Sequence, residues 1–198
     1  MKQLCALLAL LALLLTGCAA GQTDTRAGDL QQKYAALSGC DASVLVAVVR
    51  DGETRQYTLD IVKDGDETRV TVREPEALSG VSAVVSGDTL SLEFDGMALD
   101  AGSMDERISA VNASDIVLRA AASGYVTERN RERYEDTDAL RLCFETEQGG
   151  ERLYVTAWFD AEDAPLYAEL ERGGEVLAYL EFTDFVFHDI ITAGGYYT

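Results

Sequence analysis

Residues 153–159, Leu-Tyr-Val-Thr-Ala-Trp-Phe, decide the fold, because an apolar residue occupies every second position. Side chains along a β-strand point alternately to the two faces of the sheet, so Leu153, Val155, Ala157 and Phe159 share one face. Gly149-Gly150, just before this stretch, is a turn signal. The sequence therefore predicts a strand with one buried face that follows a tight turn.

The same alternation recurs along most of the chain. Leu140, Leu142 and Phe144 precede the stretch, and Leu166, Ala168 and Leu170 follow it. The run Val176, Ala178, Leu180, Phe182 changes phase at Thr183-Asp184, which predicts a β-bulge. Further strands are expected at 44–50, 54–63, 68–73, 81–86 and 89–94, with hairpin turns at Asp51-Gly52 and Asp64-Gly65. Strands joined in this way predict a meandering antiparallel sheet.

Helical spacing is found in two places. Leu30, Tyr34 and Leu37 lie on one face of an expected helix over 26–37, and a second helix is expected over 112–123, ended by Gly124. Residues 97–111 lack a regular pattern and are interpreted as a loop, whose acidic residues match no calcium-binding spacing. Residues 125–134 carry alternating charges and are expected to form an exposed edge.

The N-terminus has the composition of an export signal. Lys2 precedes an apolar run over 4–15, which is shorter than the roughly 20 residues that span a bilayer. Leu15-Thr16-Gly17-Cys18 closes this run and resembles a bacterial lipobox. The resemblance implies a signal peptide over 1–17, a lipid on Cys18, a flexible tether over 18–25 and one domain over 26–198. The alternative is an ordinary secretory signal cleaved elsewhere, for example after Ala20.

Charge and cysteine content limit the function classes. The net charge of −19 makes nucleic acid an improbable partner, because phosphate recognition needs a basic surface. Cys40 and Cys143 remain after Cys5 leaves with the signal, and outside the cytoplasm they could form a disulfide or stay free. No metal site, cofactor motif or catalytic group is expected. His188 is the single histidine and has no nucleophile at triad spacing, so the sequence predicts a protein that is not an enzyme.

The order of these elements resembles the lipoprotein-carrier (LolA/LolB-like) fold. The resemblance covers about 26–188 and is most specific in Trp158-Phe159-Asp160, in Pro165-Leu166-Tyr167-Ala168-Glu169-Leu170 and in Glu181-Phe182-Thr183-Asp184-Phe185. It implies a mainly β (α+β) domain. In that fold a single curved antiparallel sheet of about eleven strands forms an unclosed β-barrel, with two or three covering helices.

The resemblance also implies that acyl chains of lipids or lipoproteins bind in an apolar concavity. Residues expected to line such a cavity are Leu59, Ile61, Leu90, Leu92, Phe94, Leu142, Phe144, Val155 and Phe159. The alternative is that the helices fill the concavity and these residues are core. The chain would then be a non-catalytic lipoprotein of the envelope, or one that supports sporulation or germination, and would bind a protein partner.

The chain departs from the carrier pattern in two ways. A lipid on Cys18 is incompatible with shuttling between membranes, and no equivalent of the lid-locking arginine is found. Leu78 lies broadly where the anchored relatives carry an exposed apolar loop residue, although it could instead pack at the start of a strand.

Overall fold

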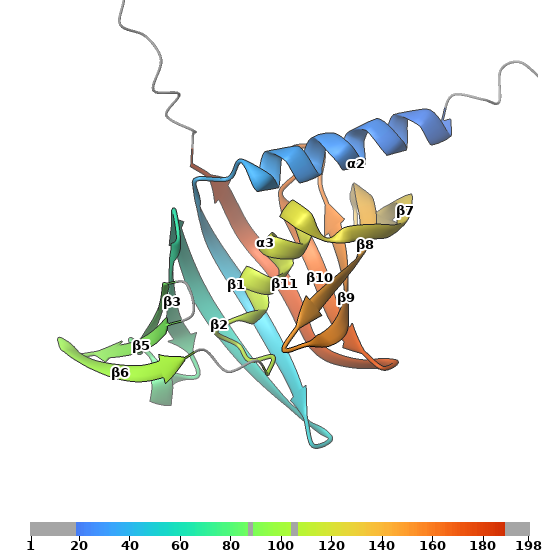
Figure 1. The fold of residues 1–198 in the computed structure, drawn as a ribbon. Coiled ribbons are helices and arrows are strands. Elements are labelled where there is room, and N and C mark those ends of the chain that lie inside the picture. Colours follow the sequence, from blue (N-terminus) through green and yellow to red (C-terminus); the bar gives the residue numbers. More distant parts are fainter. Residues whose placement is uncertain (1–18, 87–88, 104–106, 189–198) are drawn as a thin grey trace, which may run out of the picture.

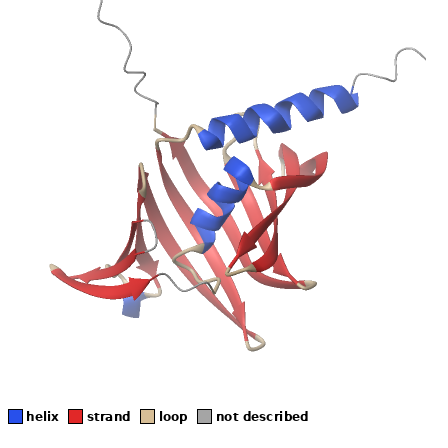
Figure 2. Ribbon diagram, viewed as in Figure 1, coloured by secondary structure: helices blue, strands red, loops and turns tan. Residues whose placement is uncertain are grey.

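The computed structural model describes residues 19–86, 89–103 and 107–188. Within them, the strands belong to one antiparallel sheet of eleven members (Figures 1 and 2). They are β1 (Gly39–Arg50), β2 (Glu53–Asp64), β3 (Glu67–Glu74), β4 (Ser82–Ser86), β5 (Thr89–Phe94), β6 (Met97–Ser103), β7 (Tyr125–Tyr134), β8 (Thr137–Gln148), β9 (Glu151–Phe159), β10 (Pro165–Arg172) and β11 (Glu175–Phe187).

The sheet is open, with β6 at one edge and β7 at the other. Its order is β6-β5-β4-β3-β2-β1-β11-β10-β9-β8-β7, so the chain runs outward from the centre, enters again at β7 and returns to the centre at β11. Every neighbouring pair except β1 with β11 is also consecutive in the chain, because short turns favour antiparallel hairpins. The predicted architecture of a single unclosed sheet of about eleven strands is confirmed.

Strand register brings the alternating apolar residues onto one continuous concave face. Val44 of β1 pairs with Leu59 of β2 and with Phe182 of β11. Phe144 of β8 pairs with Val155 of β9 in the same way. Asp184 pairs with Ser43 and Phe182 pairs with Val44, which leaves Thr183 as the extra residue. The predicted bulge at Thr183-Asp184 is therefore confirmed.

Two α-helices in the described ranges lie against this sheet, α2 (Ala19–Ala35) and α3 (Ala113–Ser123). Helix α3 lies inside the curve and α2 lies across one end of it (Figure 1). Ile116, Val117 and Ala120 of α3 are buried, as the helical spacing predicted. A short 3-10 helix, η1 (Glu76–Leu78), joins β3 to β4. None of the helices described is long and apolar enough to cross a bilayer.

Two element boundaries differ from the prediction. Helix α2 begins at Ala19 rather than at residue 26, so the backbone of most of the expected tether is helical. Residues 97–103 form β6 rather than a loop. Residues 97–100 of β6 are exposed, Met97 and Leu99 among them, and the strand pairs with β5. The expected exposed edge over 125–134 is confirmed as β7.

The cysteines do not form a disulfide. Cys40 and Cys143 are both free thiols, and β11, β10 and β9 lie between their strands. Cys40 is buried in phase with Ala42 and Val44, whereas Cys143 lies between the buried Leu142 and Phe144 and so points to the opposite face. A one-residue difference in phase turns a side chain to the other side of a sheet. The possible Cys40–Cys143 bridge is therefore incompatible with the strand register.

Candidate functional site

Most of the residues expected to line a cavity lie in a closed core. Six side chains are at most 2% exposed and belong to one apolar cluster with α2 and α3: Leu59, Ile61, Leu142, Phe144, Val155 and Phe159. Helix α3 contacts β8, β9 and β11, so it occupies the deepest part of the curve. These six residues therefore belong to a filled core, as in the alternative interpretation of the sequence, and do not line an open cavity.

The other three expected residues lie on β5, beyond the cover of the helices. Leu90 and Leu92 are half-buried, and Phe94 is 52% exposed. Phe94 pairs with Met97 across the β5–β6 turn, which makes an exposed apolar corner of the sheet. Leu78 in η1 is also exposed, so the alternative that it packs at a strand start is wrong.

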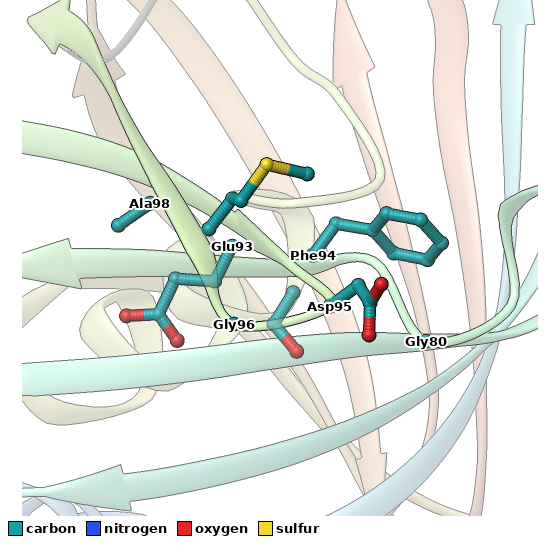
Figure 3. A pocket seen from close by; sticks show the side chains of 8 residues that line it. Gly80, Glu93, Phe94, Asp95, Gly96 and Ala98 are labelled. Atoms are coloured by element: carbon teal, nitrogen blue, oxygen red, sulfur yellow. The ribbon is translucent and has the colours of Figure 1, made fainter.

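A shallow hollow lies beside this corner. Figure 3 shows the Phe94 ring turned toward Gly80 and the Glu93 carboxylate turned away from that ring. The hollow has a volume of about 370 Å³, but Glu93 and Asp95 bring two carboxylates into its lining. Glu93 also pairs with Arg69. Phe94 and Met97 are the only large apolar residues in the lining of this hollow, and both are exposed.

A second cleft opens where the long β1–β2 hairpin extends past the start of α3. We call it the mouth cleft, and its volume is about 370 Å³. Its lining consists of Val48, Arg50, Asp51, Glu53, Arg55, Tyr57, Ile108, Ser109 and Ala110. Ligand sites in proteins are commonly clefts of roughly 300–1,000 Å³ with apolar walls and a few polar groups, so the mouth cleft falls in that range.

The floor of the mouth cleft is continuous with the core. Val48, Tyr57 and Ile108 are half-buried and pack against the core cluster. Val48 shares the concave face with Val46 and pairs with Arg55 of β2. The segment that carries Ile108 is held by Asn112, whose side chain accepts a hydrogen bond from Ser109 N and donates one to the Arg107 carbonyl, both 2.8 Å.

The rim of the mouth cleft carries both signs of charge. Arg55 Nη2 lies 3.3 Å from Glu53 Oε2, and Arg50 Nε lies 3.8 Å from Asp51 Oδ2. All four side chains are exposed, so these pairs are solvated and add little to stability. An apolar floor beneath a zwitterionic rim matches a ligand that has an apolar tail and a polar head.

None of the residues that line the mouth cleft is among those expected from the sequence to line a cavity. Tyr57 is in phase with Leu59 and Ile61, so the alternation in 54–63 could have placed it on the same face. Ile108 gave no signal, because it lies in an irregular segment that only the tertiary fold brings onto the hairpin.

His188 lies just past β11, and its Nε2 is 3.2 Å from Asp41 Oδ1 at the sheet end. In the ranges that the structure describes, no group of three or more His, Cys, Asp or Glu side chains is placed to hold a metal. Cys18 and the segment 1–17 lie outside the described residues, so their lipidation and cleavage stay predictions.

The architecture is the one that the sequence resemblance implied, an unclosed curved sheet with α3 inside the curve and α2 across its end. The fold is LolA-like. No protein-family model matches the chain, and no curated protein matches its sequence.

Several solved structures are similar to this LolA-like domain. A LolA superfamily protein from Nitrosomonas europaea has 15% identity and a TM-score of 0.46, over 83% of this chain and 94% of that one. LprF from Mycobacterium bovis has 10% identity and a TM-score of 0.48, over 83% and 93%. Lipoprotein LppX from Mycobacterium tuberculosis has 15% identity and a TM-score of 0.45, over 80% and 93%. At these values the similarity concerns the fold alone.

Proposed function

We propose that this chain is a non-catalytic lipoprotein, held on the extracytoplasmic face of the cell membrane by a lipid on Cys18. We further propose that it binds the apolar part of a lipid or other amphiphile in the mouth cleft. The observation that carries this proposal is the incomplete cover of the concave face. The helices close its centre, whereas the mouth cleft keeps an apolar floor open beneath the β1–β2 hairpin.

The energetics favour an acyl chain over a fully polar ligand. Each methylene that leaves water for an apolar floor contributes about 0.8 kcal/mol. Val48, Tyr57 and Ile108 supply that floor, and the rim places Arg50 and Arg55 where a polar or anionic head would lie. The cleft is small, so it suits one chain or part of one rather than a whole diacyl lipid.

The test is native mass spectrometry of residues 19–198 exported in a bacterial host, with lipid extraction of any retained mass. Starting after Cys18 removes the protein's own anchor from the measurement. We expect a stoichiometric acyl-bearing ligand, or uptake of added fatty acid or lysolipid. A clean apo mass with no uptake would contradict the proposal.

A matched pair of variants locates the binding. Val48→Asp places a charge on the cleft floor, and Val62→Asp places the same charge at an exposed position on the other face of β2. We expect Val48→Asp to abolish uptake and Val62→Asp to retain it. Equal uptake by both variants would place the ligand elsewhere.

The second candidate function is binding of an envelope protein by a domain whose core is filled. It is favoured by the burial of six of the nine residues that were expected to line a cavity. Crosslinking in intact cells, followed by identification of the partner, tests it. A crosslinked partner together with a clean apo mass would select this candidate over the first.

A further inference from the structure

The convex face of the sheet carries a row of side chains, two of them aromatic, that the core does not use. Register places Arg141, Trp158, Tyr167, Glu181 and Leu45 side by side on β8, β9, β10, β11 and β1. All of them are half-buried except Glu181, which is exposed. Their neighbours in the chain point to the core, so this row faces outward from the sheet.

Tyr134, at the end of β7, joins the two aromatic rings of this row in one cluster. The rings of Tyr134 and Tyr167 lie 5.3 Å apart and nearly parallel, at 16°, and Trp158 lies 5.4 Å from Tyr167. The guanidinium carbon of Arg141 lies 5.5 Å from the centre of the Trp158 ring. The group thus already holds one guanidinium from the chain itself, by the attraction between a cation and an aromatic face.

A groove of about 270 Å³ borders the aromatic group on the side of β1 and β2. Its lining includes Tyr167, Tyr179, Glu181 and Leu45, and it contains one carboxylate but neither lysine nor arginine. Glu169 pairs with Tyr179 across β10 and β11 and accepts a hydrogen bond from the Tyr167 hydroxyl at 3.2 Å. The arginines of β8 and β10 pair with other carboxylates, Arg141 with Glu128 and Arg172 with Glu151.

These observations define the chemistry of an occupant. Burial, followed by the charge of Glu169, raises the pKa of Tyr167. Two tyrosine rings and an exposed carboxylate complement an organic cation, and the net charge of −19 favours its approach. The groove is smaller than most drug-sized sites, so it fits one cationic side chain.

We propose that this convex surface docks a basic segment of a partner protein, with an arginine or lysine side chain seated in the groove between Tyr167 and Tyr179 beside Glu181. The inference gives the second candidate function a location and a partner chemistry. It is independent of the amphiphile proposal, because the mouth cleft opens on the concave face.

The chain supplies its own probe, because Trp158 is its single tryptophan. The experiment uses the full lipidated chain in detergent micelles and follows Trp158 emission during titration with an arginine-rich peptide. A citrulline analogue of that peptide, which has the same shape without charge, is the ligand control. We expect a salt-sensitive change in emission with the arginine peptide alone.

Two isosteric variants remove one carboxylate each. Glu181→Gln acts in the groove, and Glu147→Gln acts at an exposed position near the β8–β9 turn. We expect Glu181→Gln to weaken peptide binding about three- to tenfold, and Glu147→Gln to leave it within about twofold. Circular dichroism and thermal unfolding establish that both variants fold.

Three outcomes would overturn the proposal. The first is no emission change with the peptide in the folded wild type, and the second is equal binding of the citrulline analogue. The third is that the protein binds phosphatidylcholine vesicles but not the peptide, and that Glu181→Gln weakens the binding of vesicles. This result would assign the groove to a lipid head group. If native mass spectrometry finds no lipid on residues 19–198, the amphiphile proposal fails, but the peptide titration on the convex face is unaffected. The two proposals can therefore fail separately.

Discussion

The hydroxyl of Tyr34 on α2 donates a 2.8 Å hydrogen bond to the carbonyl oxygen of Asp163 in the β9–β10 turn. The same turn accepts a hydrogen bond from Arg26 at the Asp160 carbonyl and pairs with Lys33 at 3.6 Å through Asp163. The Tyr34 ring packs edge-on against Phe159 and Phe187, each at 5.7 Å. These contacts with the β9–β10 turn hold helix α2 over the end of the curved sheet.

Removal of the Tyr34 hydroxyl tests this attachment. Tyr34 is 4% exposed, and burial raises the pKa of its hydroxyl, which therefore stays protonated as a donor. Tyr34→Phe leaves the Asp163 carbonyl without this donor, and we expect the free energy of unfolding to fall by about 1 kcal/mol. Denaturant unfolding measures it. The control Tyr125→Phe removes a hydroxyl from a ring that is 74% exposed, and no change is expected; equal losses would contradict the attachment.

Two glycine-to-alanine changes should alter stability in opposite directions. At Gly124 an added Cβ would lie 2.6 Å from the Ala120 oxygen and 2.9 Å from the Phe144 Cβ, so α3 or β8 must shift. We expect Gly124→Ala to destabilise by about 1–3 kcal/mol, as overpacking does. Gly28 lies within α2 with nothing within 4 Å of an added Cβ. There alanine should stabilise by about 0.5–1 kcal/mol. Thermal unfolding of both variants checks the signs; stabilisation by Gly124→Ala would refute the packing described there, and destabilisation by Gly28→Ala would contradict the open space at Gly28.

Two phenylalanines that the sequence placed in one group should behave differently. Phe144 is fully buried under α3, whereas Phe94 is 52% exposed at the sheet corner. Phe144→Ala should cost about 3–5 kcal/mol, since it removes a core ring and leaves a cavity. Phe94→Ala should change stability by no more than about 0.5 kcal/mol. Similar costs in urea unfolding would mean that the concave face is not divided into covered and open parts.

Thiol chemistry should distinguish the two cysteines. Burial raises the pKa of Cys40 from 9.0 to about 11, and the nearby Asp41 adds to this while Lys63 opposes it. Because the thiolate is the reactive form, Cys40 should stay unmodified at pH 8. Cys143 is half-buried and should react first. Thiol labelling of residues 19–198 with peptide mapping measures both rates, and faster labelling of Cys40 would contradict the burial.

The same shift makes stability depend on pH. Folding favours the protonated Cys40 thiol. The contribution of this thiol to the free energy of unfolding is therefore complete below pH 9 and is lost as the pH rises toward about 11. Wild type should therefore lose stability relative to Cys40→Ala across this interval. Parallel pH profiles of the two proteins would show that Cys40 does not titrate as described.

Local periodicity in the sequence was enough to predict most of the strands and the faces on which their residues lie. Alternation at 153–159 and its repeats predicted an antiparallel sheet with one apolar face, and the phase change at Thr183-Asp184 predicted the bulge, because both are local consequences of a two-residue period. Strand β6 was not predicted, although its pairing with β5 across a short turn is local, because Met97 and Leu99 are exposed and residues 97–103 were interpreted as an irregular loop.

Which part of the apolar face is closed depends on how the helices pack on the sheet. Leu59, Phe144 and Leu92 have the same alternating pattern, yet the first two are core and the third is half-buried, because the position of α3 determines what is covered. The mouth cleft is lined by both Val48 and Ile108, which are sixty residues apart in the sequence. The convex row needs β1, β11, β10, β9 and β8 side by side in register. Alternation specifies the face on which a residue lies, whereas its neighbours depend on strand order and helix placement, which bring together residues far apart in the sequence.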